Sequence, residues 1–156
     1  MYHNVLTGRS VTGVLHLVNK TPIDRYSKTQ STVKTATCGS DFSSARTCVE
    51  QIVDLRNILR YLGIAIRNKS HMFGDNDTLV TGSTTPNAKI HKSYVALSFH
   101  RVREAIAAKI VSCNFIKGVD NPAEILSKHW SHAKAWTTLK PLLFWKGDTM
   151  ECADAE

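Results

Sequence analysis

Three acidic residues stand where metal chemistry would need them. Asp41 precedes a stretch with helical periodicity, Asp75 follows a short apolar run, and Glu124 lies just after a proline that can begin a helix. In an open α/β sheet, strand ends and the adjoining helix starts meet at one edge, so the three carboxylates could lie together. Magnesium prefers oxygen ligands, and ions held by carboxylates can activate water for phosphodiester hydrolysis. The spacing is therefore compatible with a metal-dependent nuclease site.

A purely structural interpretation of the same residues stays open. An aspartate near a helix start, an Asp75-Asn76 turn pair and Glu124 in a first helical turn are all favourable without any metal. The sequence contains no phosphate-binding G-x-x-x-x-G-K-[ST] loop, no G-x-S-x-G elbow and no H-E-x-x-H pair. His129 and His132 are three residues apart with no cysteine nearby, which favours surface histidines over a zinc site.

The elements that would position these carboxylates begin with two strands. The β-branched and apolar residues 11–18 (VTGVLHLV) predict a strand, and residues 19–22 (NKTP) are typical of a turn. The Thr/Val-rich residues 31–37 (STVKTAT) predict its antiparallel partner.

Helical periodicity begins at Phe42, and Gly63 is a typical helix stop. Residues 70–74 predict a short strand, a small helix is expected from Asp77, and residues 82–87 are expected to be a loop. One apolar stripe defines the first long helix: Ala45, Val49, Ile52, Leu55, Leu59 and Leu62.

The second half of the chain repeats this alternation. We expect a helix over about residues 92–109, a strand over 110–116, a short helix over 123–126 and a last helix over 132–143. Strands that alternate with long helices predict an α/β layer fold with a mixed sheet.

Composition limits the class of protein. The 156 residues hold 20 Lys and Arg against 13 Asp and Glu, a formal net charge of +7, which favours an anionic partner such as nucleic acid. The longest run without Asp, Glu, Lys or Arg, residues 78–88, is far shorter than the ~20 apolar residues of a membrane helix. We expect an intracellular protein, cytoplasmic or nuclear, with no membrane contact. Without a C-x-x-C pair, four cysteines are expected to be reduced thiols: Cys38, Cys48, Cys113 and Cys152.

Several short segments match one known family in order and spacing. Residues 9–13 (RSVTG) are similar to R-K-S-T-S-G, residues 27–33 (SKTQSTV) to S-K-K-Q-P-T-V, and residues 39–42 (GSDF) stand where the family has S-T-E-A-E-Y. Residues 73–76 (FGDN) are similar to Y-C-D-N. Residues 100–104 (HRVRE) are similar to H-F-V-R-E, and residues 121–128 (NPAEILSK) to L-A-D-I-L-T-K. The chain resembles the ribonuclease H domain that follows reverse transcriptase in copia-type retrotransposon polyproteins, over about residues 9–128.

The resemblance implies a ribonuclease H-like mixed β-sheet flanked by helices. It implies hydrolysis of the RNA strand of an RNA–DNA hybrid, with Mg²⁺ or Mn²⁺ held by Asp41, Asp75 and Glu124 as catalytic residues. The implied domain spans residues 9–145, with residues 1–8 a frayed remnant and residues 146–156 an acidic flexible tail.

Departures from the family predict a truncated and divergent copy. The family's first catalytic aspartate ends a first strand upstream of R-K-S-T-S-G, whereas no acidic residue precedes Asp24 here. Asp41 replaces Glu and Glu124 replaces Asp, and Mg²⁺ tolerates little distortion of its ligands. We therefore expect a fold that lacks the first strand and a weakened or absent nuclease activity.

A remnant that binds without catalysis is the alternative. It could hold an RNA–DNA hybrid or other nucleic acid by its backbone, or it could pack on the reverse transcriptase region of the same polyprotein or on a second copy through a sheet edge and Trp130, Trp136 and Trp145. Solvated surface charges are an equally open interpretation of the basic residues, and ordinary core aromatics are the favoured interpretation of the tryptophans. The candidate nucleic-acid contacts are Asn76, Lys89, Lys92, Arg101, Arg103 and Lys117.

Overall fold

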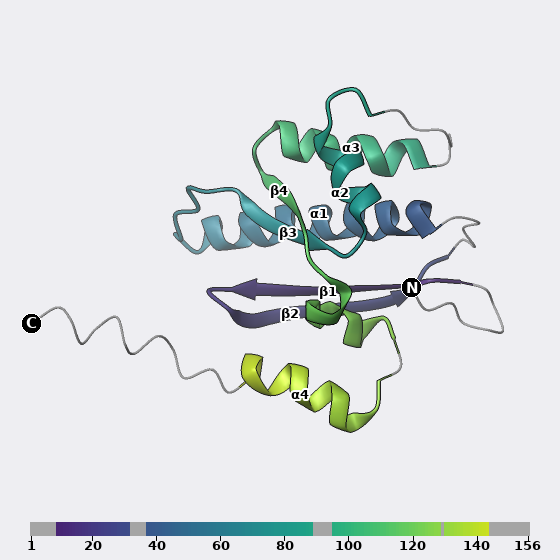
Figure 1. Ribbon diagram of the computed structural model, residues 1–156. Helices are drawn as coiled ribbons and strands as arrows, with labels where there is room; N and C mark the ends of the chain where they lie inside the picture. Colours follow the sequence, from purple (N-terminus) through teal and green to yellow (C-terminus); the bar gives the residue numbers. More distant parts are fainter. Residues whose placement is uncertain (1–8, 32–36, 89–94, 129, 144–156) are drawn as a thin grey trace, which may run out of the picture.

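The protein is a mixed α/β structure in which short strand pairs lie against helices (Figure 1). The computed structural model describes residues 9–31, 37–88, 95–128 and 130–143, so the expected N-terminal remnant and acidic tail lie outside the described residues. The elements are β1 (Val11–Val18), β2 (Thr21–Thr29), α1 (Thr37–Tyr61), β3 (Ser70–Gly74), α2 (Asp77–Thr84), α3 (Ala96–Ala107), β4 (Val111–Phe115), the 3₁₀ turns η2 (Gly118–Asp120) and η3 (Pro122–Leu126), and α4 (His132–Leu143).

β1 and β2 form an antiparallel hairpin that returns sooner than the sequence predicts. Asn19 and Lys20 have φ of 47° and 67°, the left-handed geometry of a tight two-residue hairpin turn. Pro22 is therefore not in the turn but in β2, opposite Leu17 at a register shift, where the ladder tolerates a residue without an N–H. The predicted second strand over residues 31–37 is wrong. Of that range only Ser31 and Thr37 are described, and Thr37 already belongs to α1.

β3 and β4 form a separate, parallel pair, with Ser70 opposite Val111 and Gly74 opposite Phe115. Parallel neighbours need a long crossover, and α2 and α3 supply it. Among the described residues no strand pairing joins this pair to the hairpin, so the single mixed sheet expected from the sequence is replaced by two two-stranded sheets. The ribonuclease H-like arrangement stays a prediction.

α1 is the central element, with the hairpin on one side of it and α2 and α3 on the other (Figure 1). The first three residues of the expected stripe, Ala45, Val49 and Ile52, are buried in the core with α3 and the β3–β4 pair. Leu55 and Leu59 are only partly buried, and Leu62 lies after α1 and is exposed, so the stripe is shorter than expected. Alternate residues of β1, Thr12, Val14 and His16, are buried on the face toward α1. The opposite face of β1 is covered by η3, and α4 packs against β2.

The element bounds refine several expectations. α1 begins at Thr37 rather than Phe42, and α2 extends to Thr84, so part of the expected loop over residues 82–87 is helical. α3 ends at Ala107, after which Lys109 has a positive φ of 57°. Residues 123–126 belong to a 3₁₀ turn rather than an α-helix. Within the described residues no helix is long and apolar enough to cross a membrane.

Candidate carboxylate site

Three separate elements bring the predicted carboxylates to the carboxyl end of β3. Asp75 follows β3 directly and is exposed. Asp41 lies inside α1, one turn after its start rather than at the start, and is half-buried. Glu124 lies in η3 and is buried. The backbone fixes this corner because Ile116 N donates to Gly74 O at 3.0 Å, which holds the end of β4 beside the end of β3.

Asn76 links the first two carboxylate positions. Its Oδ1 caps α2 by accepting from Thr78 N at 2.9 Å, and its Nδ2 donates to Asp41 Oδ2. The amide therefore has a structural role in addition to the nucleic-acid contact that the sequence predicts for it. Helix capping by Asn is common and accounts for the first bond; the bond to Asp41 joins residues 35 apart and has no local sequence signal.

Gly118 lies next to the other two carboxylates. A Cβ atom on Gly118 would lie 3.2 Å from Glu124 Oε1 and 3.8 Å from Asp75 Oδ2. Both carboxylates therefore border the same backbone position, and a larger residue there would crowd them. Asn121 holds η3 in place, since its Oδ1 accepts from Ala123 N at 3.1 Å.

Burial raises the pKa of Asp41 above its ordinary value. Loss of solvent disfavours the charged carboxylate, and repulsion from Asp75 adds to the rise, whereas the hydrogen bond from Asn76 opposes it. Two carboxylates that repel one another are a physical reason for a cation to bind near them. Buried carboxylates with a purely structural role also have a raised pKa, so the raised pKa of Asp41 agrees with a functional site but does not by itself identify one.

Lys128 is the residue at this corner whose role the sequence did not reveal. Its Nζ donates to Glu124 Oε1, and the Lys128 side chain is mostly covered. The signal was the i, i+4 spacing of Glu124 and Lys128, which favours an ion pair on a helix. The ammonium supplies to Glu124 the positive charge that a divalent ion would otherwise supply.

Carboxylate oxygens are ligands that magnesium prefers, but the three side chains are not arranged to bind one ion together. Across the described ranges, no group of three His, Cys, Asp or Glu side chains is gathered closely enough to hold a metal ion. Of the three predicted carboxylates, Asp41 is bonded to Asn76 and Glu124 to Lys128, whereas Asp75 is exposed. Binding of Mg²⁺ or Mn²⁺ therefore stays a prediction, and at Glu124 the metal would either bind Oε2 beside the ammonium or displace Lys128 from Oε1.

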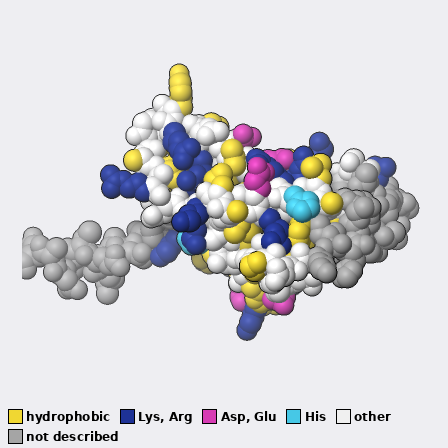
Figure 2. Space-filling view, turned by 90° about the horizontal axis from the view of Figure 1, so that it is seen from above, with side chains coloured by type: hydrophobic (Ala, Val, Ile, Leu, Met, Phe, Trp, Pro, Cys, Tyr) yellow, Lys and Arg dark blue, Asp and Glu magenta, His cyan; other side chains and the backbone are white. Residues whose placement is uncertain are grey.

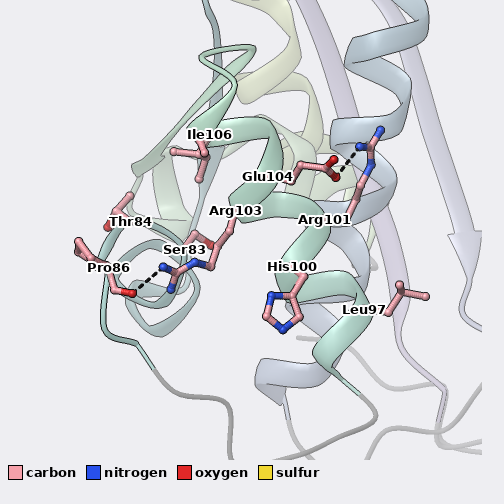
Figure 3. A pocket seen from close by; sticks show the side chains of 10 residues that line it. Ser83, Thr84, Pro86, Leu97, His100, Arg101, Arg103, Glu104 and Ile106 are labelled. Carbon is pink, nitrogen blue, oxygen red and sulfur yellow. Dashed lines mark hydrogen bonds and ion pairs between the residues drawn. The ribbon is translucent and has the colours of Figure 1, made fainter.

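The two predicted arginine contacts already have partners within the protein (Figure 3). Arg103 donates to Thr85 O at 2.9 Å and Pro86 O at 2.7 Å, and its guanidinium lies 5.1 Å from the centre of the Phe99 ring. Arg101 forms an ion pair with Glu104 at 3.0 Å. The Arg103 bonds hold α3 against the end of α2, and both arginines line an open cavity of about 680 Å³.

The remaining predicted contacts divide between the carboxylate corner and undescribed residues. Lys117 is exposed immediately before Gly118, beside the carboxylates, and Asn76 lies at the same corner. Lys89 and Lys92 lie outside the described residues. On the face seen in Figure 2, Lys and Arg side chains form separate groups with Asp and Glu among them rather than one continuous basic band.

Among the described residues, the cysteines and aromatic side chains offer no second reactive centre. Cys48 and Cys113 are free thiols, as expected, and burial raises their pKa to about 12 and about 11. Thiolates are the reactive form, so these two side chains are inert at neutral pH. Trp136 stacks on His132, and Lys134 lies over the Trp130 ring at 4.3 Å. Trp145, Cys152 and His129 are not among the described residues.

No known relative supplies an identity for this arrangement. A comparison with protein-family models, with curated proteins and with solved structures finds no match to the chain.

Proposed function

We propose that the chain is a ribonuclease H-like domain derived from a copia-type retrotransposon polyprotein. Its ancestral reaction is the metal-dependent hydrolysis of the RNA strand of an RNA–DNA hybrid, and this copy performs it weakly or has lost it. The observation that carries the proposal is that Asp41, Asp75 and Glu124, singled out from the sequence, come from three elements to one end of β3.

The reaction would require a divalent ion at this corner. Bound there, Mg²⁺ or Mn²⁺ would activate a water molecule and stabilise the leaving oxygen of the cleaved phosphodiester. Asp75 is the exposed carboxylate available for its capture, and Asp41 and Glu124 are the neighbouring donors. The exposed Lys117 beside them is suited to a phosphate of the hybrid backbone.

Impairment follows from the contacts that the donors already make. A metal that uses Glu124 Oε1 must displace Lys128, and one that uses the bonded oxygen of Asp41 must displace Asn76. Each donor already occupied in this way weakens binding of an ion that demands a near-octahedral oxygen shell.

The test is cleavage of a fluorescently labelled RNA–DNA hybrid by the full chain in MgCl₂ and in MnCl₂. We expect slow cleavage of the RNA strand that is abolished in Asp75→Asn. The matched control is Asp54→Asn, which changes an exposed aspartate on α1 outside the corner. Cleavage that survives Asp75→Asn would overturn the assignment of the site, and cleavage at the rate of an intact ribonuclease H would overturn the impairment.

A metal-free hybrid binder is the second candidate, and the Lys128–Glu124 ion pair favours it. With the lysine in place, the corner carries its own cation and can face a phosphate backbone without a divalent ion. Binding of a labelled hybrid in EDTA, weakening steeply as salt rises and reduced in Lys117→Met, would support this candidate. Binding only after addition of Mg²⁺ would support the nuclease instead.

A further inference from the structure

A cavity of about 900 Å³ separates the hairpin from the parallel strand pair. It is lined by consecutive residues of both strands, residues 13–19 along β1 and all of Ser70–Gly74 in β3. Successive residues of a strand point to opposite faces, so a cavity that touches every residue in turn meets the strand along its edge. The cavity is therefore a slot between two strand edges.

Both of these edges lack a strand partner within the described part of the chain. β1 pairs with β2 along its other edge, and β3 pairs with β4 along its other edge. Unpaired edges present backbone N–H and C=O groups in the spacing that another strand requires. A polypeptide backbone could satisfy both rows at once.

α1 provides the third wall of the slot, and this wall is mainly apolar. Ile52, Leu55 and Leu59 line it from α1, together with Ile64 from the following loop. Leu55 and Leu59 are only partly buried and Ile64 is 50% exposed, although the same helix is fully packed on its α3 side. Apolar side chains of an inserted segment would complete this packing.

The direction of the two strands along α1 is opposite. Thr12 contacts Ser44 and His16 contacts Gln51, so β1 runs toward the carboxyl end of α1. Arg56 donates to Ser70 Oγ at 3.0 Å, whereas Asn76 beyond the other end of β3 reaches Asp41, so β3 runs back. One inserted strand can therefore be parallel to β3 and antiparallel to β1.

The volume of the slot matches one short strand. A strand residue within a packed sheet occupies about 4.8 Å by 10 Å by 3.3 Å, or about 160 Å³. The slot thus holds about five or six residues, similar to the five residues of β3.

The charges at the two ends of the slot differ in sign. Arg56, Arg67 and Lys69 line the end at which β3 begins, and Asp41 and Asp75 line the end at which it finishes. A segment parallel to β3 would fit these charges with acidic residues at its N-terminal end and basic residues at its C-terminal end.

We infer that this slot binds one extended segment of a partner polypeptide, which adds as a strand between β1 and β3 and joins the two pairs into one sheet. The bound segment has apolar side chains on alternate residues, an acidic N-terminal flank and a basic C-terminal flank. This is β-strand addition, in which backbone bonds give affinity and side chains give selectivity. The inference does not depend on the nuclease proposal, because it uses Asp41 and Asp75 only as negative charges at one end of the slot and requires no metal or cleavage.

The test uses a fluorescein-labelled nine-residue peptide with two glutamates, five alternating threonines and valines, and two lysines, in that order. We expect saturable binding to the full chain by fluorescence anisotropy, with new protection of β1 and β3 amides in hydrogen–deuterium exchange. The same peptide N-methylated on alternate central residues keeps its side chains but loses N–H donors and should not bind. Equal binding of the methylated peptide would overturn strand addition.

Charge reversal locates the peptide without disturbing the core. Arg67→Glu, at the slot, should weaken binding about tenfold, and a peptide with N-terminal lysines should recover it. Arg60→Glu is the matched control, since Arg60 is an exposed arginine that does not line the slot. Equal effects of the two variants would overturn a partner segment as the occupant of the slot. Binding only after deletion of residues 1–8 would overturn it too, and so would concentration-dependent dimers that exclude the peptide.

Discussion

The two sides of α1 are built from different interactions. Toward α3 and β4 the contacts are apolar, with Val49, Val102 and Val111 excluded from solvent. Toward the hairpin they are largely polar: Thr12 bonds Ser44 at 2.9 Å and His16 bonds Gln51 at 3.1 Å. Apolar burial contributes about 1.5–3 kcal/mol for each large side chain, and a hydrogen bond contributes a net of about 0.5–1.5 kcal/mol.

The two sides of α1 therefore differ in their expected contributions to stability and to function. The buried apolar contacts on the α3 side are expected to contribute most of the stability. The hairpin side of α1 contains the slot and, at the end of the slot, the carboxylate corner. Polar attachment leaves the hairpin side less strongly held, which suits a surface that accepts a strand or an ion. Variants on the two sides should therefore differ in size of effect and in what they change.

The largest effect is expected from Phe99→Ala on the apolar side. Phe99 is buried, and its ring centre lies 5.4 Å from that of Phe42. Removal of the ring leaves a cavity between α1 and α3 and should lower the free energy of unfolding by about 3–5 kcal/mol, measured by urea denaturation.

The control for this prediction is Leu97→Ala on the same helix, where the side chain is 69% exposed and the change should be within about 0.5 kcal/mol. If Phe99→Ala does not fold, Phe99→Leu should still be less stable by about 1 kcal/mol. Equal effects at positions 97 and 99 would contradict the apolar side as the main source of stability.

An intermediate effect is expected from Gln30→Ala on the polar side. Gln30 is buried, and its Nε2 donates to Thr12 Oγ1 at 3.0 Å and to Ser40 O at 3.1 Å. Loss of this amide removes bonds between the hairpin and α1 and should lower the free energy of unfolding by about 1–3 kcal/mol. Lys28→Ala, an exposed change in β2, should leave it unchanged; a Gln30→Ala protein as stable as the parent would contradict the polar attachment.

Elements with a strong one-sided pattern were predictable from the sequence. The apolar run of β1, the short strand β3 and the last helix α4 occur over the expected residues. Gly63, the expected helix stop, follows the end of α1 and has a positive φ of 80°. Burial of one face imposes a period on the sequence, and that period is what the prediction used.

The rest depended on contacts that have no local period. β2 was missed because it is mostly exposed and polar, and Pro22 resembled a turn residue although it lies at an irregular position in the ladder. The convergence of Asp41, Asp75 and Glu124 was anticipated from strand ends, but the partners Asn76 and Lys128 follow from side-chain packing. The slot could not be anticipated from local patterns, because it is bounded by strands and a helix distant in sequence.

A smaller effect is expected from Lys128→Met at the carboxylate corner. The change keeps the apolar stem of the side chain but leaves the buried Glu124 carboxylate without its cation. The pair is neither fully buried nor fully exposed, so we expect the free energy of unfolding to fall by about 1–2 kcal/mol. Millimolar MgCl₂ should then stabilise the variant more than the parent, because a metal that binds only the folded state adds its binding free energy.

The thermal midpoint with and without MgCl₂ measures this prediction, and Lys117→Met is the control, as an exposed lysine next to the same corner. An identical magnesium response in parent and Lys128→Met would show that the lysine does not compete with a metal.

The smallest effect, and the one with a pH signature, is expected from Asp41→Asn. Burial and the Asp75 charge raise the pKa of Asp41 above 3.8 in the folded state, so its contribution to stability is present below pH 3.8 and is lost as pH rises through the raised value. At neutral pH the ionised carboxylate therefore opposes folding, and Asn, which can still accept from Asn76, should be slightly more stable than Asp. This advantage should shrink as pH falls toward 4. Urea denaturation across that range measures it against Asp54→Asn, an exposed change on the same helix. A loss of stability at neutral pH in Asp41→Asn would instead show that the charge itself holds the hairpin end of α1 to α2, and the contrast between the two sides of the helix would not extend to this corner.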